Sequence, residues 1–240
     1  MTKDKLAERL TPQWGSWEPG TVELMRRTVR EGDVVFDVGA HVGYYATLLS
    51  TLVGPGGGVH AFEPHPGNFQ VLSRNTAELA NVTVVNTAVT EHPGRRLLHF
   101  SSNTGRHSLF RTEFTGGAGR SLEVPTATLD DYWAGIGCPP VALVKIDVEG
   151  AEPLVIRGAR AFIDANPGIR VISEYYPRNL RWDGGDEQAY LALLGERDLR
   201  CWAIHDDGTL TDALPELTGD DYINILCQRD SLDPTPEVTT

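Results

Sequence analysis

Acidic side chains stand at the ends of two apolar segments, where they could bind a cation or accept a proton. Asp147 follows the segment 141–146, and Glu174 closes the segment 170–174. If both segments are strands of a parallel sheet, their carboxyl ends meet at one edge. Carboxylates there suit a hard divalent cation such as Mg²⁺, or one of them acts as a general base. The sequence therefore predicts Asp147 and Glu174 as catalytic residues and as a metal pair. Glu149 and Glu152 have a competing interpretation, as helix N-terminal carboxylates.

Two histidines are further candidates for a proton acceptor, because a neutral imidazole takes up a proton near physiological pH. His107 lies in a polar, glycine-rich stretch, and His205 lies at the end of a late apolar segment, before two aspartates. The competing interpretation of each is an exposed loop histidine without a chemical role.

The turn of residues 37–43 has the glycine spacing of a ligand-binding turn. It follows the apolar segment 34–38 directly and precedes an amphipathic stretch that begins at Tyr44. Glycines at such a turn let the backbone approach a ligand closely. The spacing is G-x-x-x-G, whereas a pyrophosphate-binding turn has G-x-G-x-x-G. The pattern favours a nucleoside ligand without a diphosphate over a dinucleotide, and a plain tight turn is the alternative.

A second feature supports a nucleoside site. Glu63 ends the next apolar segment, 24 residues after Gly39, and is followed by Pro64. An acidic residue at that position of an α/β sheet is placed to accept hydrogen bonds from a ribose diol. Thr87 and Ala88 follow the third apolar segment, where an adenine would lie.

Alternating strands and helices are needed to position these residues, and the pattern of the chain predicts them. Short apolar segments separated by amphipathic stretches are typical of βαβ units and a parallel sheet. Residues 90–128 interrupt this alternation and predict a β-hairpin insertion, and residues 199–204 and 222–228 predict a closing antiparallel pair. The predicted parallel strands are 34–38, 59–62, 82–86, 141–146 and 170–174, and the predicted helices are 20–30, 44–52, 67–79, one from about 151, and 186–197.

The chain length suits one domain with additions. Residues 1–31 are expected to form a covering segment with a helix, residues 32–230 an α/β domain, and residues 231–240 a polar, disordered tail.

Composition narrows the possible partners and the compartment. The formal net charge is −12, from 21 basic and 33 acidic residues, so nucleic acid is disfavoured as a partner. No apolar run approaches the ~20 residues of a membrane helix, and residues 1–10 lack the apolar core of a secretory signal. The three cysteines are interpreted as reduced core thiols. We therefore expect a cytoplasmic protein with a small-molecule partner and no membrane association.

Five motifs, in order along residues 32–174, resemble those of the FkbM-type methyltransferases. They are Asp37-Val38-Gly39-Ala40-His41-Val42-Gly43, Phe62-Glu63-Pro64, Thr87-Ala88-Val89, Thr128-Leu129-Asp130-Asp131 and Lys145-Ile146-Asp147-Val148-Glu149-Gly150-Ala151-Glu152. The resemblance implies a Rossmann-like class I methyltransferase fold, with a mostly parallel seven-stranded sheet and helices on both faces. It also implies S-adenosylmethionine as the methyl donor and O-methylation of a hydroxyl on a natural product or saccharide.

The resemblance also implies a set of donor-binding residues. Asp37, Gly39 and Gly43 would line the methionine end, and Glu63 would hold the ribose. His41 departs from the family, which often has Asn there. The full set is Asp37, Gly39, Ala40, His41, Gly43, Tyr44, Glu63, Pro64, Asn68, Thr87 and Ala88.

Other functions remain as alternatives at this point. A nicotinamide-dependent oxidoreductase would share the sheet and the ribose carboxylate, and a non-catalytic nucleoside-binding module would share the turn. Among O-methylation acceptors, a saccharide or oligosaccharide is preferred to a polyketide-type hydroxyl, because the insertion is polar from Ser101 to His107. A homodimer is expected through the N-terminal helix and the insertion.

Overall fold

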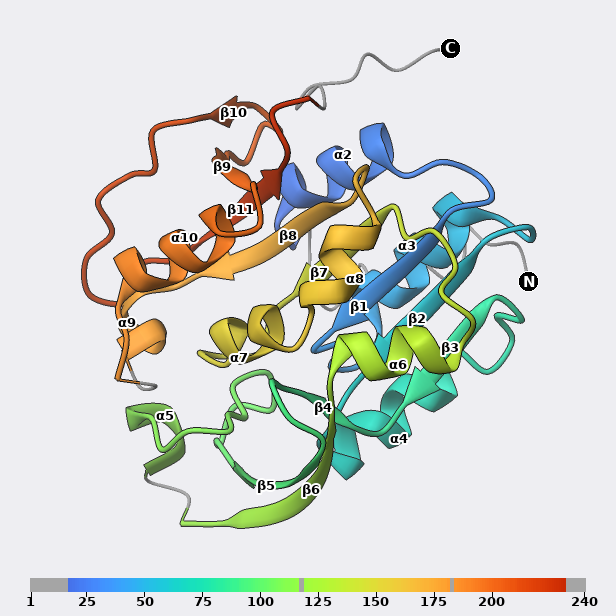
Figure 1. The fold of residues 1–240 in the computed structure, drawn as a ribbon. Coiled ribbons are helices and arrows are strands. Elements are labelled where there is room, and N and C mark those ends of the chain that lie inside the picture. Colours follow the sequence, from blue (N-terminus) through green and yellow to red (C-terminus); the bar gives the residue numbers. More distant parts are fainter. Residues whose placement is uncertain (1–16, 117–118, 182–183, 232–240) are drawn as a thin grey trace.

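Two β-sheets form the framework of the computed structural model, which describes residues 17–116, 119–181 and 184–231 (Figure 1). The larger sheet has eight strands in the order β10-β9-β11-β8-β7-β1-β2-β3, with parallel pairing from β3 through to β8. Its strands are β1 (Val34–Val38), β2 (Gly58–Phe62), β3 (Val82–Val85), β7 (Leu143–Ile146), β8 (Arg170–Tyr175), β9 (Arg200–Ile204), β10 (Leu210–Thr211) and β11 (Ile223–Gln228). The mostly parallel sheet is confirmed. Its eighth strand is the two-residue β10 at the edge, which is too short to give a periodic signal.

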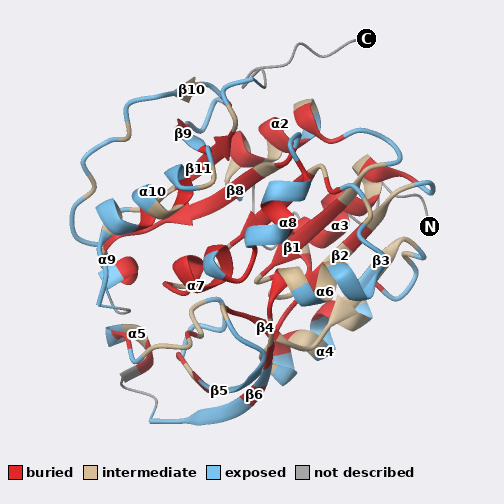
Figure 2. Ribbon diagram, in the orientation of Figure 1, coloured by how far each residue is buried: buried red, intermediate tan, exposed pale blue. Residues whose placement is uncertain are grey.

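Helices cover both faces of the larger sheet, because its central strands are apolar on both sides. Figure 2 shows these strands as the most continuously buried part of the molecule. One apolar cluster joins the sheet to α2, α3 and α4, and the other joins it to α6, α7, α8 and α10. The helices are α2 (Pro19–Thr28), α3 (Tyr44–Val53), α4 (Pro66–Asn75), α5 (Glu113–Gly116), α6 (Leu129–Gly135), α7 (Glu152–Arg157), α8 (Arg160–Ala165), α9 (Pro177–Leu180) and α10 (Glu187–Gly195).

The smaller sheet confirms the predicted hairpin insertion. β5 (Gly94–His99) pairs antiparallel with β6 (Ser121–Ala127), and β4 (Ala88–Val89) joins the other edge of β6. In Figure 1 this sheet lies beside the carboxyl ends of the central strands. The long connection from β5 to β6 is therefore placed to cover a site at that edge.

The closing antiparallel pair is also confirmed, as β9 and β11. The predicted helix 67–79 is shorter than expected and ends at Asn75. The interpretation of all three cysteines as core thiols was wrong for Cys138, which is exposed; Cys201 is partly buried and Cys227 is buried.

Some expectations fall where the structure gives no description. Of the covering segment 1–31, residues 1–16 lie outside the described residues, as do residues 232–240 of the predicted tail. Within the described part of the chain, the helices are too short or too polar to span a membrane.

Candidate active site where the strand order reverses

A cavity of about 290 Å³ lies beyond the carboxyl ends of the central strands. β1 lies between β7 and β2, so the chain order of the strands reverses there, and ligands of open α/β sheets bind in the crevice that such a reversal leaves. The cavity walls come from the segments after β1, β2, β7 and β8 and from the β5–β6 connection. Its volume is near the lower end of small-ligand sites, roughly 300–1,000 Å³.

The turn after β1 lies tight against its neighbours at Gly39. The backbone N–H groups of Gly39 and Ala40 both donate to the Phe62 carbonyl, at 3.0 and 2.8 Å. Gly39 has φ +89°, and a Cβ built there would be 1.8 Å from the carbonyl oxygen of Asp147. Only glycine combines this positive φ with the absence of a Cβ. The turn is thereby fixed to the ends of both neighbouring strands.

His41 has φ +50°, in the left-handed region where Asn, Asp and His are enriched among non-glycine residues. This explains how His can replace the Asn that the resembling family often carries: both side chains tolerate the same backbone conformation. In that conformation the His41 N–H donates to Glu63 Oε2 at 3.0 Å.

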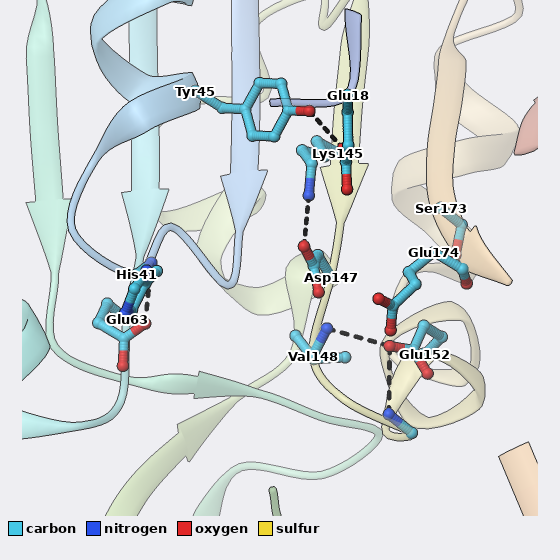
Figure 3. A network of polar contacts seen from close by, with 11 residues as sticks. Glu18, His41, Tyr45, Glu63, Lys145, Asp147, Val148, Glu152, Ser173 and Glu174 are labelled. Atoms are coloured by element: carbon cyan, nitrogen blue, oxygen red, sulfur yellow. Dashed lines mark hydrogen bonds and ion pairs between the residues drawn. The ribbon is translucent and has the colours of Figure 1, made fainter. Parts of the chain in front are cut away.

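Glu63 presents a fixed, buried carboxyl group to the cavity. Its Oε1 accepts from the His65 N–H at 2.7 Å, and its side chain lies beside His41 in Figure 3. Burial raises the pKa of Glu63 to about 8, although the backbone N–H groups of His65 and His41 act in the opposite direction. Burial therefore favours the protonated form of this carboxyl group in the ligand-free protein.

Nine of the eleven donor-binding residues predicted from the resemblance line this cavity: Gly39, Ala40, His41, Tyr44, Glu63, Pro64, Asn68, Thr87 and Ala88. Asp37 and Gly43 are not among the described lining residues, and the expected contact of these two with the donor stays a prediction. The side chain of Asp37 is buried on the α3 side of the sheet, in register with Lys145. Gly43 precedes α3 with φ +93°, and a Cβ there would meet Leu72 Cδ1 at 2.8 Å, so its role is close packing against α4.

The connection from β5 to β6 reaches over the cavity. Asn68 Nδ2 on α4 donates to the Thr104 carbonyl at 3.0 Å, and Thr104 Oγ1 lies 3.2 Å from His41 Nε2. Asn103, Gly105 and Arg106 line the cavity beside Thr104. The polar insertion predicted to face an acceptor is therefore part of the wall.

Three carboxyl groups converge on the opposite wall. One carboxylate oxygen each from Asp147, Glu149 and Glu174 lies within 4.8 Å of the others. Burial, followed by repulsion from Asp147, raises the pKa of Glu149 to about 8 and that of Glu174 well above its usual range. The predicted pair of Asp147 and Glu174 is thus brought together, with Glu149 as a third member.

The sequence allows both Glu149 and Glu152 to be helix N-terminal carboxylates, but the structure gives them different surroundings. Glu152 Oε1 accepts from the N–H groups of Val148 and Gly150, at 3.0 and 3.3 Å, as a helix N-terminal carboxylate does (Figure 3). Glu149 has φ +54° and lines the cavity. Non-glycine residues in this backbone region are concentrated at functional sites.

Lys145 balances part of this negative charge. Its buried ammonium lies 2.8 Å from Asp147 Oδ2 and 4.6 Å from the ring centre of Tyr45, whose hydroxyl donates to Glu18 (Figure 3). Burial alone would lower the pKa of Lys145, but the carboxylates of Asp147, Glu18 and Asp37 together raise it. Lys145 therefore stays charged and fixes the position of Asp147.

The two candidate histidines lie in different parts of the structure. His107 lines the cavity, but its Nδ1 accepts from the Ser101 N–H at 3.0 Å, so in the neutral ring Nε2 carries the proton. Burial and the neighbouring His65 lower the pKa of His107 to about 4. This geometry suits a hydrogen-bond donor better than a base.

His205 is not brought to this cavity. It is exposed, its Nε2 lies 2.9 Å from Thr211 Oγ1 at the β9–β10 edge, and it is not among the described residues of the cavity wall. β9 lies three strands away from β7 in the sheet, so its end does not reach the site.

Other wall residues were missed by sequence reasoning. Glu18, Tyr45 and Tyr222 line the cavity from segments far apart in the chain. None belongs to the quoted motifs, and no spacing signal links them, because they meet only through packing of α2, α3 and the segment before β11.

Comparison with known proteins agrees with this architecture. A solved structure of a methyltransferase FkbM from Methylobacillus flagellatus matches with a TM-score of 0.50 and 18% identity, over 81% of this chain and 43% of the other. Fibrillarin of Aeropyrum pernix, solved with bound S-adenosyl-L-methionine, matches with a TM-score of 0.53 and 15% identity, over 88% and 76%. At these identities the likeness shows the fold alone, which is the Rossmann-like class I methyltransferase fold.

Sequence relatives are more specific. The chain is 33% identical to 31-O-demethyl-FK506 methyltransferase FkbM of Streptomyces tacrolimicus, over 62% of this chain and 67% of that protein. It is 26% identical to hexuronic acid methyltransferase AglP of Haloferax volcanii, over 59% of this chain and 56% of that protein. The family model for the methyltransferase FkbM domain matches residues 37–199, which is more than half of the chain. This match, together with the cavity at the strand reversal, shows that the chain belongs to the FkbM methyltransferase family.

Proposed function

We propose that this methyltransferase transfers a methyl group from S-adenosylmethionine to a hydroxyl oxygen of a saccharide or a sugar-containing small molecule. The observation that carries the proposal is the shared cavity, where Glu63 and the β1 turn face the carboxyl group of Asp147. One wall fits a nucleoside, and the other fits an acceptor that must lose a proton.

The donor half of the cavity has the groups that S-adenosylmethionine needs. Glu63, Thr87 and Ala88 line the same cavity; Glu63 would accept from the ribose hydroxyls, and Thr87 and Ala88 would contact the adenine. S-adenosylmethionine, when bound, supplies a methyl group already activated by its sulfonium. The protein must then hold an acceptor oxygen in line with that methyl group and remove its proton.

Asp147 is the residue best placed to take this proton. Lys145 holds one of its oxygens at 2.8 Å, and 27% of its side chain is exposed, toward the cavity that it lines. The pKa values of Glu149 and Glu174 are raised, so these two groups hold protons more readily than an exposed carboxyl group does. In this proposal His107 donates a hydrogen bond to the acceptor.

Two acceptor classes have support. The polar wall of Asn103, Thr104 and Arg106 suits the hydroxyl groups of a sugar, and AglP is a hexuronic acid methyltransferase by name. A polyketide-type hydroxyl is the second candidate, because the relative from Streptomyces tacrolimicus is named for a demethylated FK506. Transfer of labelled methyl groups to a panel of saccharides and macrolides would distinguish them, and labelling of macrolides alone would contradict the saccharide proposal.

Calorimetric titration with S-adenosylmethionine and S-adenosylhomocysteine tests the donor assignment. We expect micromolar binding of both, and binding at least about tenfold weaker in Glu63→Ala, since hydrogen bonds to charged groups contribute about 1.5–3 kcal/mol each. Glu78→Ala is the matched control, because Glu78 is exposed and does not line the cavity. A folded wild-type protein that binds neither ligand would refute the proposal.

A further inference from the structure

We propose that Asp147, Glu149 and Glu174 form a binding site for one hard divalent cation on the acceptor side of the cavity. The three side chains come from the segment after β7 and from the end of β8. Asp147 and Glu174 alone would supply two protein ligands for the ion, and Glu149 supplies a third. The site itself does not depend on methyl transfer, whereas its role in catalysis rests on the proposed function.

The spacing of the carboxylate oxygens fits one ion. All three lie within 4.8 Å of one another. Cation–oxygen distances of about 2.1 Å for Mg²⁺ and about 2.4 Å for Ca²⁺ put oxygens on opposite sides of the ion about 4.2–4.8 Å apart. The three oxygens therefore reach a common centre with little side-chain movement.

A buried oxygen without a partner is the second observation. Glu174 is 7% exposed, and its Oε2 has no hydrogen-bond partner among the described residues. A buried polar atom left unpaired is costly, and such atoms are uncommon in native proteins. Glu174 lines the cavity and its carboxyl group points toward Glu152 and Asp147 in Figure 3. A cation would satisfy the oxygen that no protein donor reaches.

The protein's own donors leave room for this ion. Lys145 binds Asp147 through Oδ2, and Asn179 Nδ2 donates to Glu149 Oε2 at 2.9 Å. Each of these two carboxylates has a second oxygen for a cation. Lys145 pairs with Asp147, so the ion would balance the carboxylates of Glu149 and Glu174.

A cation at this position has a defined use in the proposed reaction. A bound divalent ion stabilises an alkoxide and lowers the pKa of a coordinated hydroxyl group. The acceptor hydroxyl would coordinate the ion as a further ligand and lose its proton more readily. The proton would pass to Asp147, which would serve as an ion ligand and as the base.

Titration with Mn²⁺ followed by electron paramagnetic resonance tests the site directly. The full chain, saturated with S-adenosylhomocysteine, is expected to bind one Mn²⁺, with Mg²⁺ or Ca²⁺ competing. We expect Glu174→Gln and Asp147→Asn each to weaken Mn²⁺ binding at least about tenfold, since a charged ligand is lost. Glu78→Gln, at an exposed carboxylate outside the cavity, should bind Mn²⁺ like the wild type.

Glu149→Gln is the additional variant if Glu174→Gln fails to fold, because Glu149 is only partly buried. Absence of saturable Mn²⁺ binding by the folded wild type at about 1 mM ion, or unchanged binding in all folded cluster variants, would overturn the proposal. Mn²⁺ binding without S-adenosylhomocysteine binding would overturn the proposed function instead and leave the cation site standing.

Discussion

Gly39 shows how much of this site depends on the backbone of single residues. Its φ of +89° and the nearby Asp147 carbonyl bring the ends of β1 and β7 together. A side chain at Gly39 would push these ends apart, and both the donor turn and the carboxylate cluster depend on them. Packing at one residue thus sets the distance between the two halves of the cavity.

Gly39→Ala should therefore destabilise the protein strongly. The added Cβ would meet a backbone carbonyl at 1.8 Å, and neither strand end can move without disturbing the sheet. We expect a loss of at least about 2 kcal/mol of unfolding free energy, measured in urea. Gly56→Ala is the control, since its φ is ordinary and nothing lies within 4 Å of the added Cβ; equal stabilities of the two variants would contradict the interpretation.

Asp147→Asn should separate chemistry from donor binding. Asp147 faces the acceptor side, and the asparagine keeps its shape while removing the basic oxygen and the charge paired with Lys145. A positioned base contributes about 10²–10⁴-fold to a rate, so we expect turnover to fall at least about 100-fold. The dissociation constant of S-adenosylhomocysteine should change less than about tenfold. Near-normal turnover would remove Asp147 from the catalytic residues.

At the scale of elements, the insertion is part of the donor site as well as of the acceptor site. The connection between β5 and β6 is held by Asn68 on α4 and meets His41 on the β1 turn through Thr104. Three elements distant in the chain are therefore joined at the rim of the cavity. Loosening one hydrogen bond at this rim should affect ligands on both sides.

Asn68→Ala tests this connection. The substitution removes the hydrogen bond from Asn68 to the Thr104 carbonyl. A hydrogen bond of this kind typically contributes about 0.5–1.5 kcal/mol to stability. We expect donor binding to weaken about two- to tenfold, with faster proteolysis within residues 100–116. Gln70→Ala, at an exposed position of the same helix outside the cavity, should behave as the wild type. Identical affinity and proteolysis in Asn68→Ala would contradict a closing role for the connection.

At the scale of the whole molecule, buried ionisable groups make the stability of the protein depend on pH. Some groups lower the stability as the pH rises, and others lower it as the pH falls. Burial raises the pKa of Glu63 from 4.5 to about 8, so its contribution to stability is complete below pH 4.5 and is lost as the pH rises toward 8. Burial lowers the pKa of His107 from 6.5 to about 4, so its contribution is complete above pH 6.5 and is lost as the pH falls.

The raised pKa values of Glu149 and Glu174 act in the same direction as that of Glu63, so the ligand-free protein should be more stable on the acidic side of neutrality than at pH 8. Urea unfolding from pH 5 to 9 measures this profile. Glu63→Gln removes one titrating group, and it should flatten the decline between pH 6.5 and 8, where His107 no longer opposes it, by up to about 1.4 kcal/mol per pH unit. Stability that rises steadily from pH 5 to 9 would contradict the raised pKa of Glu63.

The homodimer expected from the N-terminal helix and the insertion stays a prediction. Leu97 on β5 and Leu122 on β6 are 51% and 42% exposed, so apolar surface is present on the insertion. Sedimentation equilibrium at several concentrations measures the oligomeric state, and a monomer throughout would contradict the expectation.

The sequence by itself determined the sheet, the turn and the acidic strand ends. Apolar segments and glycines act locally, so the β1 turn, Glu63 and Asp147 could be assigned to strand ends from spacing alone. The same local reasoning could not tell that Asp37 and Gly43 lie outside the described cavity wall, although both have the right position in the motif. Side-chain direction depends on what packs against each strand face, which spacing does not contain.

Tertiary structure alone decided which distant residues share the site. Glu149 joins Asp147 and Glu174 because the backbone after β7 turns at a positive φ, and Lys145 packs against the ring of Tyr45 from α3, whose hydroxyl donates to Glu18. His205 has the chemistry of a base but lies on a strand that the sheet order places away from the cavity. Residue type and spacing are local properties of the chain, whereas proximity, burial and charge coupling arise only when its elements pack.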